Sequence, residues 1–247
     1  MTPLTSDPLR VRTTAIGLLS FAAAEEQLLL ATAAWSNGND QGSPDRWAAV
    51  PLVAHNTDFR NQQVQRLDAV RTGTVPPAFA EIDHTSAEVY RGYCQPPHTV
   101  AEASRQSTQD LIAGLSAISD EDLLDPARNP WLGGRQLWLQ IVVRGFWHPT
   151  GHLGDYYIGH GQPGRAVALH NQAVTWARYL NAPDAAQGMA SYNLACAQAR
   201  AGRPDDAYAA LSEAIALNSD LLANAARDAD LSSLRDHGKL DALLGYG

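Results

Sequence analysis

Apolar residues recur at helical spacing along most of this sequence, whereas no segment alternates apolar and polar residues with the period of two typical of a half-buried strand. Proline and glycine divide the helical pattern into successive segments. A hydrophobic content of 45% is enough to fill the core of a globular protein. The sequence therefore predicts an all-α chain.

The first helical segment begins at Asp7 and Pro8, a helix-capping residue followed by the residue favoured in the first turn. We expect a helix from there to about Trp35. Five apolar residues mark its expected buried face: Ile16, Leu19, Ala23, Leu30 and Ala34. Glu25 and Glu26 interrupt the apolar pattern, and a solvated helix face is the simplest place for both carboxylates.

Two further helices are expected before residue 120. Pro51 is compatible only with a first helical turn, so the second helix should begin near Ala48 and continue to Val70. Thr99 and Glu102 have the spacing of a capping box, which places the start of the third helix at this point.

The next helix, expected from Arg135 to Gly159, carries two histidines and an internal proline. Pro149 should kink it, because the proline ring opposes the carbonyl four residues earlier. His148 and His152 are four residues apart, so both imidazoles project from one face and can hold one ion between them. The same spacing is also typical of two histidines that are merely hydrogen-bonded.

A third histidine favours the metal-binding interpretation. His55 lies early in the second expected helix, and packing of the two helices would bring three neutral imidazoles to one centre. Three protein ligands leave further positions open, which is the arrangement of a catalytic rather than a structural site. We therefore predict a divalent metal ion, Zn, Ni or Fe, bound by His55, His148 and His152.

The chain becomes alanine-rich from Gly161 onward. One spacing of a turn glycine and two alanines occurs twice, 41 residues apart: Gly161, Ala166 and Ala173, then Gly202, Ala207 and Ala214. A helical-hairpin repeat explains this pattern, although alanine-rich helices can share such spacings by accident. We expect a helical bundle domain over residues 1–160 and a helical repeat domain over residues 161–247.

The histidine pattern resembles that of a known superfamily. Trp47 lies eight residues before His55, and His148 and His152 follow on the last expected bundle helix. This arrangement resembles that of the DinB-like (DinB/YfiT) superfamily. The resemblance covers roughly residues 8–160 and departs at Asn56, where leucine is common in the family. It implies an up-down four-helix bundle that holds a divalent metal through three histidines.

The C-terminal part is similar to tetratricopeptide repeats. Six residues fall on the small and apolar signature positions of that family: Leu194, Ala195, Gly202, Ala207, Leu211 and Ala214. Ser219 stands where the closing proline is usual, and residues 226–235 resemble the segment that closes such arrays. This resemblance implies helical hairpins that could bind a protein or peptide. Four residues are candidates for the binding face: Asn171, Arg178, Asn193 and Arg200.

The superfamily resemblance implies metal-dependent chemistry on a small electrophile, either as a transferase that attaches a low-molecular-weight thiol or as a thiol-assisted isomerase. A metal with open positions suits this chemistry, because it lowers the pKa of a bound thiol. The same metal could activate water for hydrolysis. Another branch that resembles this bundle contains detoxifying hydrolases without a metal triad, and a non-catalytic partner-binding protein is the remaining alternative.

Two carboxylates are spaced to assist the histidines. Asp58 is about one helical turn beyond His55, and Asp155 is seven residues beyond His148. Either could accept a hydrogen bond from a ligand histidine or act as a general base. A surface ion pair is the alternative for both.

The charge balance narrows the expected partners. The chain has 26 acidic and 18 basic residues, a net charge of -8, and Lys239 as its only lysine. No basic cluster suited to nucleic acid occurs, and no apolar run approaches the roughly 20 residues of a membrane span. We expect a cytoplasmic protein that acts on a small molecule, binds neither nucleic acid nor membrane, and could form a homodimer.

Overall fold

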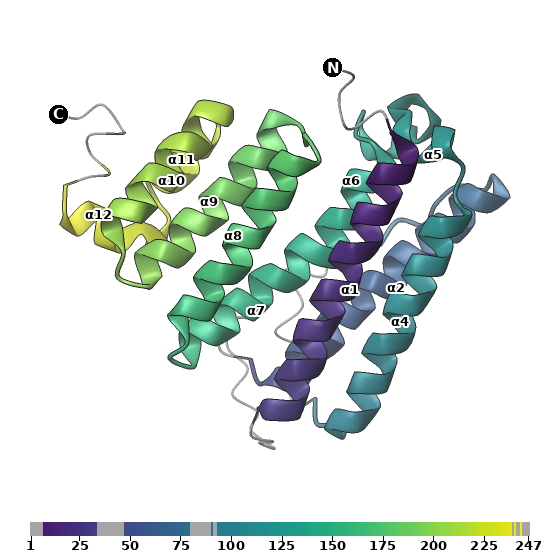
Figure 1. Cartoon of the computed structure of the whole chain (residues 1–247), viewed down its shortest axis with the longest axis horizontal. Coiled ribbons are helices and arrows are strands. Elements are labelled where there is room, and N and C mark those ends of the chain that lie inside the picture. Colours follow the sequence, from purple (N-terminus) through teal and green to yellow (C-terminus); the bar gives the residue numbers. More distant parts are fainter. Residues whose placement is uncertain are drawn as a thin grey trace. The chain divides into compact units, whose positions relative to one another are not determined.

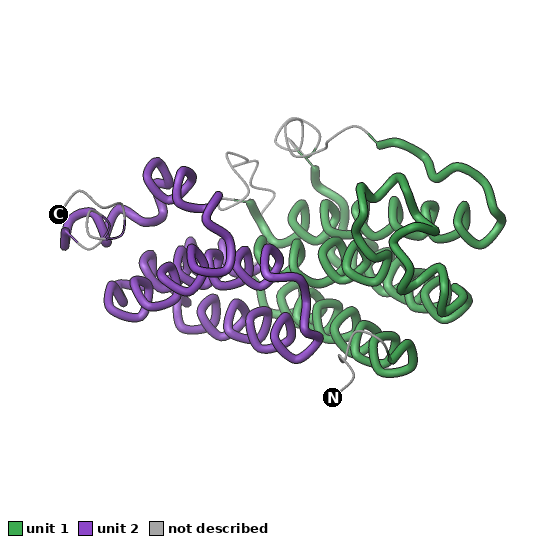
Figure 2. The backbone as a smooth tube through the Cα atoms, turned by 90° about the horizontal axis from the view of Figure 1, so that it is seen from above, with its two compact units in different colours: residues 1–152 green, residues 153–247 purple. Residues whose placement is uncertain are grey.

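The computed structural model describes the following residues: 7–33, 47–79, 90, 93–238, 240 and 243. All secondary structure in them is helical, which confirms the all-α prediction. The chain forms two compact units, residues 1–152 and 153–247 (Figure 2). The division falls inside helix α7 (His148–Gly159), whereas the sequence interpretation placed it at residue 160.

The core of the first unit is built from these helical elements: α1 (Pro8–Thr32), α2 (Ala49–Thr72), α4 (Pro97–Ala117), α6 (Leu137–Val142), the π-helical turn η6 (Val143–Trp147) and the start of α7. Helices α1 and α2 each pack against α4 and against the continuous α6–η6 segment (Figure 1). Three short elements lie between α4 and α6: α5 (Asp120–Leu124), η4 (Pro126–Arg128) and η5 (Pro130–Leu132).

Helix α1 begins as its sequence predicts. The Asp7 carboxylate accepts a hydrogen bond from the Arg10 N–H at 3.2 Å, and Pro8 occupies the first turn. The helix continues to Thr32, and the expected end at Trp35 lies outside the described residues. Both the cap and the proline therefore do what their positions in the sequence predict.

The buried face of α1 differs from the predicted one. It is formed by these residues: Val11, Ala15, Leu18, Leu19, Ala22, Glu26 and Leu29. Of the five predicted residues Leu19 is buried, Ile16, Ala23 and Leu30 are only half-buried, and Ala34 is outside the described residues. The predicted face is rotated from the observed one because we expected Glu26 in solvent, whereas it lies on the buried face.

Helix α1 is also the one helix, among the described residues, that is long and apolar enough to cross a membrane. The expectation that no such run exists is therefore wrong by length and composition. Core helices of soluble proteins pass the same test. Helix α1 packs against α4 and α6 and buries the Glu26 carboxylate, as a core helix does.

The start of α2 agrees with its prediction, and the start of α4 does not. Pro51 lies in the first turn of α2, as expected from its missing N–H. Helix α4 begins at Pro97, with Pro96 at the N-cap position and no side-chain cap. The predicted capping box is wrong because the fixed φ of Pro97 starts the helix two residues before Thr99.

The second unit contains these elements: α8 (Pro163–Tyr179), α9 (Asp184–Arg200), α10 (Pro204–Leu217), α11 (Leu221–Ala225), the 3₁₀ turn η7 (Ala229–Leu231) and α12 (Ser232–Asp236). Helix α9 packs against both α8 and α10 (Figure 1). The four alanines of the sequence repeat are buried and allow close helix packing: Ala166, Ala173, Ala207 and Ala214.

One turn conformation joins successive helices three times. Gly161, Asn181 and Gly202 have φ of 72°, 47° and 71°, and a proline follows two residues after each. In each turn the residue after the positive-φ position donates its N–H to the carbonyl five residues earlier, at 2.7–2.9 Å. This is the Schellman pattern of a helix end. The repeat found in the sequence thus contains a further turn at Asn181, which a search for glycine overlooks.

Candidate metal centre

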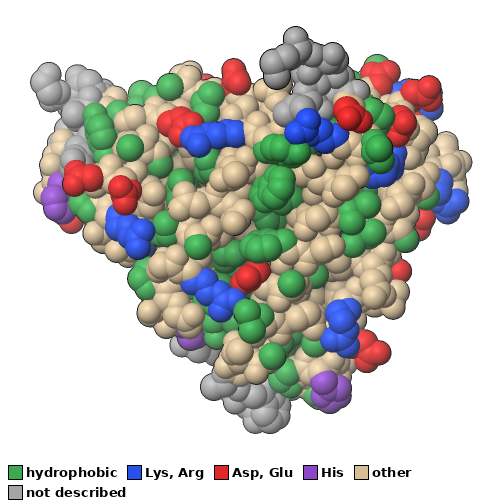
Figure 3. All heavy atoms as spheres, viewed as in Figure 1, with side chains coloured by type: hydrophobic (Ala, Val, Ile, Leu, Met, Phe, Trp, Pro, Cys, Tyr) green, Lys and Arg blue, Asp and Glu red, His purple; other side chains and the backbone are tan. Residues whose placement is uncertain are grey.

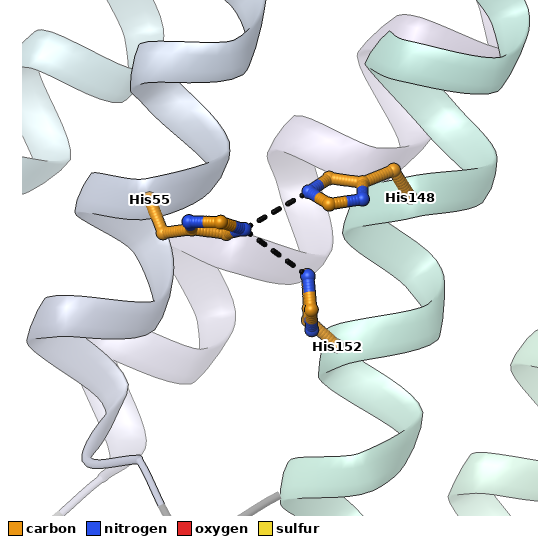
Figure 4. Close-up of side chains that lie close together, drawn as sticks. All are labelled: His55, His148 and His152. Atoms are coloured by element: carbon orange, nitrogen blue, oxygen red, sulfur yellow. Dashed lines mark hydrogen bonds between the residues drawn. The ribbon is translucent and has the colours of Figure 1, made fainter. Parts of the chain in front are cut away.

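The three predicted histidines lie together in the first unit. His55 projects from α2, whereas His148 and His152 project from the first turns of α7. Figure 4 shows the imidazoles of the α7 pair pointing toward the ring of His55. The spacing of four residues places the α7 pair on one helix face, as predicted.

A π-turn directly precedes the α7 pair. Within η6 (Val143–Trp147) the helix is wide enough for the His148 N–H to bond to the Val143 carbonyl, five residues back. Pro149 has no N–H, and its ring would oppose the carbonyl four residues earlier in a regular α-helix. The wide turn relieves this opposition, and the Thr150 hydroxyl donates to the carbonyl of Phe146 at 2.8 Å. The disturbance expected at Pro149 therefore takes the form of a π-turn.

The spacing of the ring nitrogens fits a bound ion. The Nε2 of His55 lies 3.0 Å from Nε2 of His148 and 3.2 Å from Nε2 of His152 (Figure 4). A single ring nitrogen carries either one proton or one lone pair, so it makes one good hydrogen bond rather than two. Two nitrogens bound to one ion at about 2.0–2.1 Å and near-tetrahedral or right angles are about 2.8–3.4 Å apart. The cluster could therefore hold a divalent metal ion.

His55 and His148 are in the neutral state that a metal ligand requires. Burial lowers the pKa of His55 to about 3, with a smaller contribution from His152. Burial also lowers the pKa of His148 well below its usual value, followed by the effects of His152, His55, Arg144 and Arg60. These two imidazoles are neutral at pH 7 and offer lone pairs to a cation.

The cluster is closed on one side and open on the other. His55 is only 1% exposed, whereas His148 and His152 are half-buried. An ion held by the three Nε2 atoms could therefore accept a further ligand from solvent. This is the feature that separates catalytic from structural metal sites.

Aromatic side chains surround the histidines. The ring of Trp47 stacks on His152 with centroids 6.2 Å apart and meets the edge of His55 at 5.0 Å. Phe59 contacts both His55 and His148, at 4.8 and 4.2 Å between centroids. Because Trp47 and Phe59 are almost completely buried, they hold the imidazole planes in place and exclude water from that side.

A buried ion pair lies beside the centre and was not predicted. The guanidinium of Arg60 donates to both oxygens of Glu26 at 2.9 and 2.7 Å, and both side chains are at most 1% exposed. Glu26 also accepts hydrogen bonds from Asn56 and Ser104. The expectation that Glu26 lies on a solvated face is therefore wrong, because three other helical side chains satisfy its charge.

Asp58 is linked to the histidine cluster by Tyr90. It is exposed, and its carboxylate accepts a hydrogen bond from the hydroxyl of Tyr90, whose ring lies 5.5 Å from that of His55. Burial and then Asp58 raise the pKa of Tyr90, so the phenol stays protonated and acts as the donor. A general-base role for Asp58 stays a prediction.

Asp155 belongs to the second unit and forms an ion pair there. Its carboxylate lies 2.5 Å from the Arg200 guanidinium, which also lies 3.6 Å from Asp230. This is the ion-pair alternative considered for Asp155 from the sequence. A general-base role for Asp155 also stays a prediction.

A second group of metal-type ligands occurs in the described residues, at Cys196, Asp228 and Asp230. Burial, followed by Asp228 and Asp230, raises the pKa of the Cys196 thiol, so this sulfur keeps its proton. Asp228 accepts a hydrogen bond from the Tyr192 hydroxyl at 2.7 Å and caps the turn at Asp230. A protonated thiol and an already bonded carboxylate make this group a poor competitor for a cation.

No protein-family model, curated protein or solved structure matches this chain. The assignment of a function therefore depends on the geometry of the histidine cluster and on the residues around it.

Proposed function

We propose that this chain is a metal-dependent enzyme of the DinB-like type, which adds a low-molecular-weight thiol to a small electrophile or isomerises that electrophile with the help of the thiol. The convergence of the Nε2 atoms of His55, His148 and His152 within 3.2 Å of the His55 nitrogen is the observation that carries this proposal. The packing of α1, α2, α4 and the α6–η6 segment supports an up-down four-helix bundle. The repeated turn of the second unit supports a tetratricopeptide-like arrangement.

The residues of the centre suit this chemistry. A bound divalent cation would stabilise the thiolate form of a small thiol at neutral pH. His55 and His148 are neutral, so they leave the charge of the cation undiminished. The buried rings of Trp47 and Phe59 exclude water from one side and favour thiol over water as the reacting group.

The surface supports a small-molecule substrate. On the face drawn in Figure 3, Lys and Arg side chains are interspersed with Asp and Glu, and no extended basic stripe crosses it. Two of the four candidates for partner binding are engaged elsewhere, since Arg178 pairs with Glu213 at 2.5 Å and Arg200 pairs with Asp155. These pairs make the partner-binding alternative less favourable than the enzyme. We propose the cytoplasm as the location of this enzyme.

Cobalt substitution tests the proposal. Protein purified without a metal-binding tag is stripped with a chelator, loaded with Co²⁺ and titrated with a small thiol such as 2-mercaptoethanol. A sulfur-to-metal charge-transfer band is expected on thiol addition, and it should be absent in the His148→Ala protein. The exposed His98 in α4 provides the matched control, because His98→Ala should leave the band unchanged.

Turnover provides the second measurement. Thiol consumption with an epoxide, or thiol-dependent isomerisation of maleylpyruvate, should require the metal and should be lost in His148→Ala but not in His98→Ala. A loaded protein that gives no band, no metal-dependent thiol consumption and no thiol-dependent isomerisation would refute the thiol chemistry. Metal-dependent hydrolysis under the same conditions would instead support activation of water.

A further inference from the structure

We propose that the guanidinium groups of Arg66 and Arg144 form an anion subsite next to the histidine cluster, which binds an oxyanion group of the substrate, in the simplest case a carboxylate. The identification of this anion as part of a substrate rests on the proposed function. The subsite itself is argued from contacts within the first unit.

One face of α2 leads from the histidine cluster to the first of these arginines. His55, Phe59, Gln63 and Arg66 follow one another at intervals of four, four and three residues, so they lie on one stripe of the helix. The contact between the rings of His55 and Phe59 agrees with this arrangement. Arg66 therefore occupies the same helix face as a metal ligand.

The second arginine is Arg144, in the π-turn directly before His148. Its guanidinium carbon lies 5.1 Å from the centroid of Phe59. The same Phe59 ring is 4.2 Å from the ring of His148. A single aromatic ring thus contacts both this cation and His148 of the histidine cluster.

The guanidinium of Arg66 lies against two aromatic rings. Its guanidinium carbon lies 5.0 Å from the centroid of Phe79 and 5.6 Å from that of Trp131. Its Nε is buried and has no hydrogen-bond partner, and the same holds for Nε2 of Gln63, which is 2% exposed. Two buried donors on one helix stripe therefore lack an acceptor within the protein, and an oxyanion supplies acceptors of the kind they need.

The positive charge of the two arginines is not balanced by carboxylates within the described part of the chain. Six of the other arginines there are paired with an Asp or Glu: Arg12, Arg60, Arg71, Arg128, Arg178 and Arg200. Burial, followed by the charge of Arg144, lowers the pKa of Arg66, which places the two cations within electrostatic reach of each other. An anion between them would offset both effects.

The aromatic contacts do not use the guanidinium N–H groups that would bind an anion. Rings that cover the face of a guanidinium stabilise its charge but do not use its N–H groups. The edge of the planar group remains available for the paired hydrogen bonds that guanidinium makes to carboxylate or phosphate oxygens. Arg66 and Arg144 are both half-buried, so such a group can reach them from solvent.

Anion binding is tested on the metal-free full-length protein, so that the metal itself cannot hold the anion. Succinate and inorganic phosphate are titrated by calorimetry at constant ionic strength, with neutral succinamide as the blank. Arg66→Gln and Arg144→Gln should each weaken oxyanion binding about tenfold or more, as expected for loss of a charge-assisted hydrogen bond. Arg71→Gln is the matched control on α2, since Arg71 is exposed and paired with Asp68, and it should bind as the unaltered protein does.

Chemical protection gives a measurement that needs no variant. Phenylglyoxal modifies accessible arginines, and mass spectrometry identifies each modified site. Succinate or phosphate should slow modification of Arg66 and Arg144 but not of Arg71. The more protective anion identifies the type of oxyanion group preferred.

Two results would overturn the subsite: no binding of either oxyanion, or binding and protection that do not depend on Arg66 and Arg144. Failure of the subsite is distinguishable from failure of the proposed function. The cobalt–thiol band can appear without oxyanion binding, and the metal-free protein can bind an oxyanion even if the histidines hold no metal.

Discussion

The carboxylate of Glu26 and the guanidinium of Arg60 form a bidentate ion pair in which neither side chain is more than 1% exposed. Glu26 lies on α1 and Arg60 on α2, and Arg60 also donates to Ser107 of α4 at 3.0 Å. The pair therefore joins three helices beside the histidine cluster. Each charge is acceptable in the core only because the other is present.

Removal of either partner should destabilise the protein strongly. Glu26→Ala leaves a buried guanidinium without its counter-charge, and a loss of about 3–5 kcal/mol in the free energy of unfolding is expected. Urea denaturation followed by circular dichroism measures the change. Arg71→Ala, which breaks an exposed pair with Asp68, should change stability by about 0–1 kcal/mol. Equal effects of the two substitutions would show that the buried pair is not a stabilising element of the fold.

Loss of a metal ligand should lower metal affinity without unfolding the chain. His55→Ala, His148→Ala and His152→Ala should each weaken binding of a divalent cation by more than the roughly 10- to 100-fold typical of residues that only support a ligand. Elemental analysis and competition with a chelator report the occupancy. His98→Ala should retain full occupancy, because His98 is exposed on α4. Full occupancy in all three cluster variants would eliminate the site.

Acid should destabilise the protein through His170. Burial, with a contribution from Arg200, lowers the pKa of this histidine to about 4, from an unfolded value of about 6.5. The unfolded chain therefore takes up a proton that the folded chain refuses, so stability is fully present above pH 6.5 and is lost between pH 6.5 and 4. His170 alone contributes about 1.4 kcal/mol per pH unit to the slope, and His55 and His148, whose pKa values are also lowered by burial, add to it.

A substitution isolates this contribution from that of other groups. His170→Leu should remove about one proton from the pH dependence of unfolding between pH 6.5 and 4.5, measured by urea denaturation. His98→Leu, at an exposed position on α4, is the matched control substitution. An unchanged slope in His170→Leu would mean that His170 titrates alike in both states.

A methyl group at Gly145 should disturb the π-turn. Its Cβ would lie 2.2 Å from a methyl carbon of Leu19 and 3.2 Å from one of Leu111, so the buried Leu19 side chain would have to shift. Overpacking of this kind costs about 1–3 kcal/mol. Gly17→Ala in α1 meets nothing within 4 Å and should instead be neutral or stabilising. Thermal unfolding of the two variants compares them directly.

The histidine centre could be predicted because its chemistry is local. An interval of four residues fixes the relation of His148 to His152, and one further histidine in a neighbouring helix completes the set. The helix start at Asp7 was predictable for the same reason, since the cap and the proline are adjacent in sequence.

The residues that escaped prediction depend on partners distant in sequence. Nothing near Glu26 indicates that Arg60 and Ser104 will surround it, so its charge suggested solvent. The turn at Asn181 was missed for a different reason. Asparagine can adopt the left-handed conformation, but its presence in a sequence predicts that conformation less strongly than glycine does.

The π-turn before His148 also changes the phase of the helix. The additional residue in this turn places every later side chain about 100° from the position that an unbroken α-helix would give it. The segment up to Val142 and the segment from His148 onward therefore have the same helical period but different phases. An apolar stripe that matches one segment does not continue along the other. A chain with the same residues in an unbroken α-helix would keep its histidine spacing, yet both α7 imidazoles would be turned about 100° from the positions in which they meet His55.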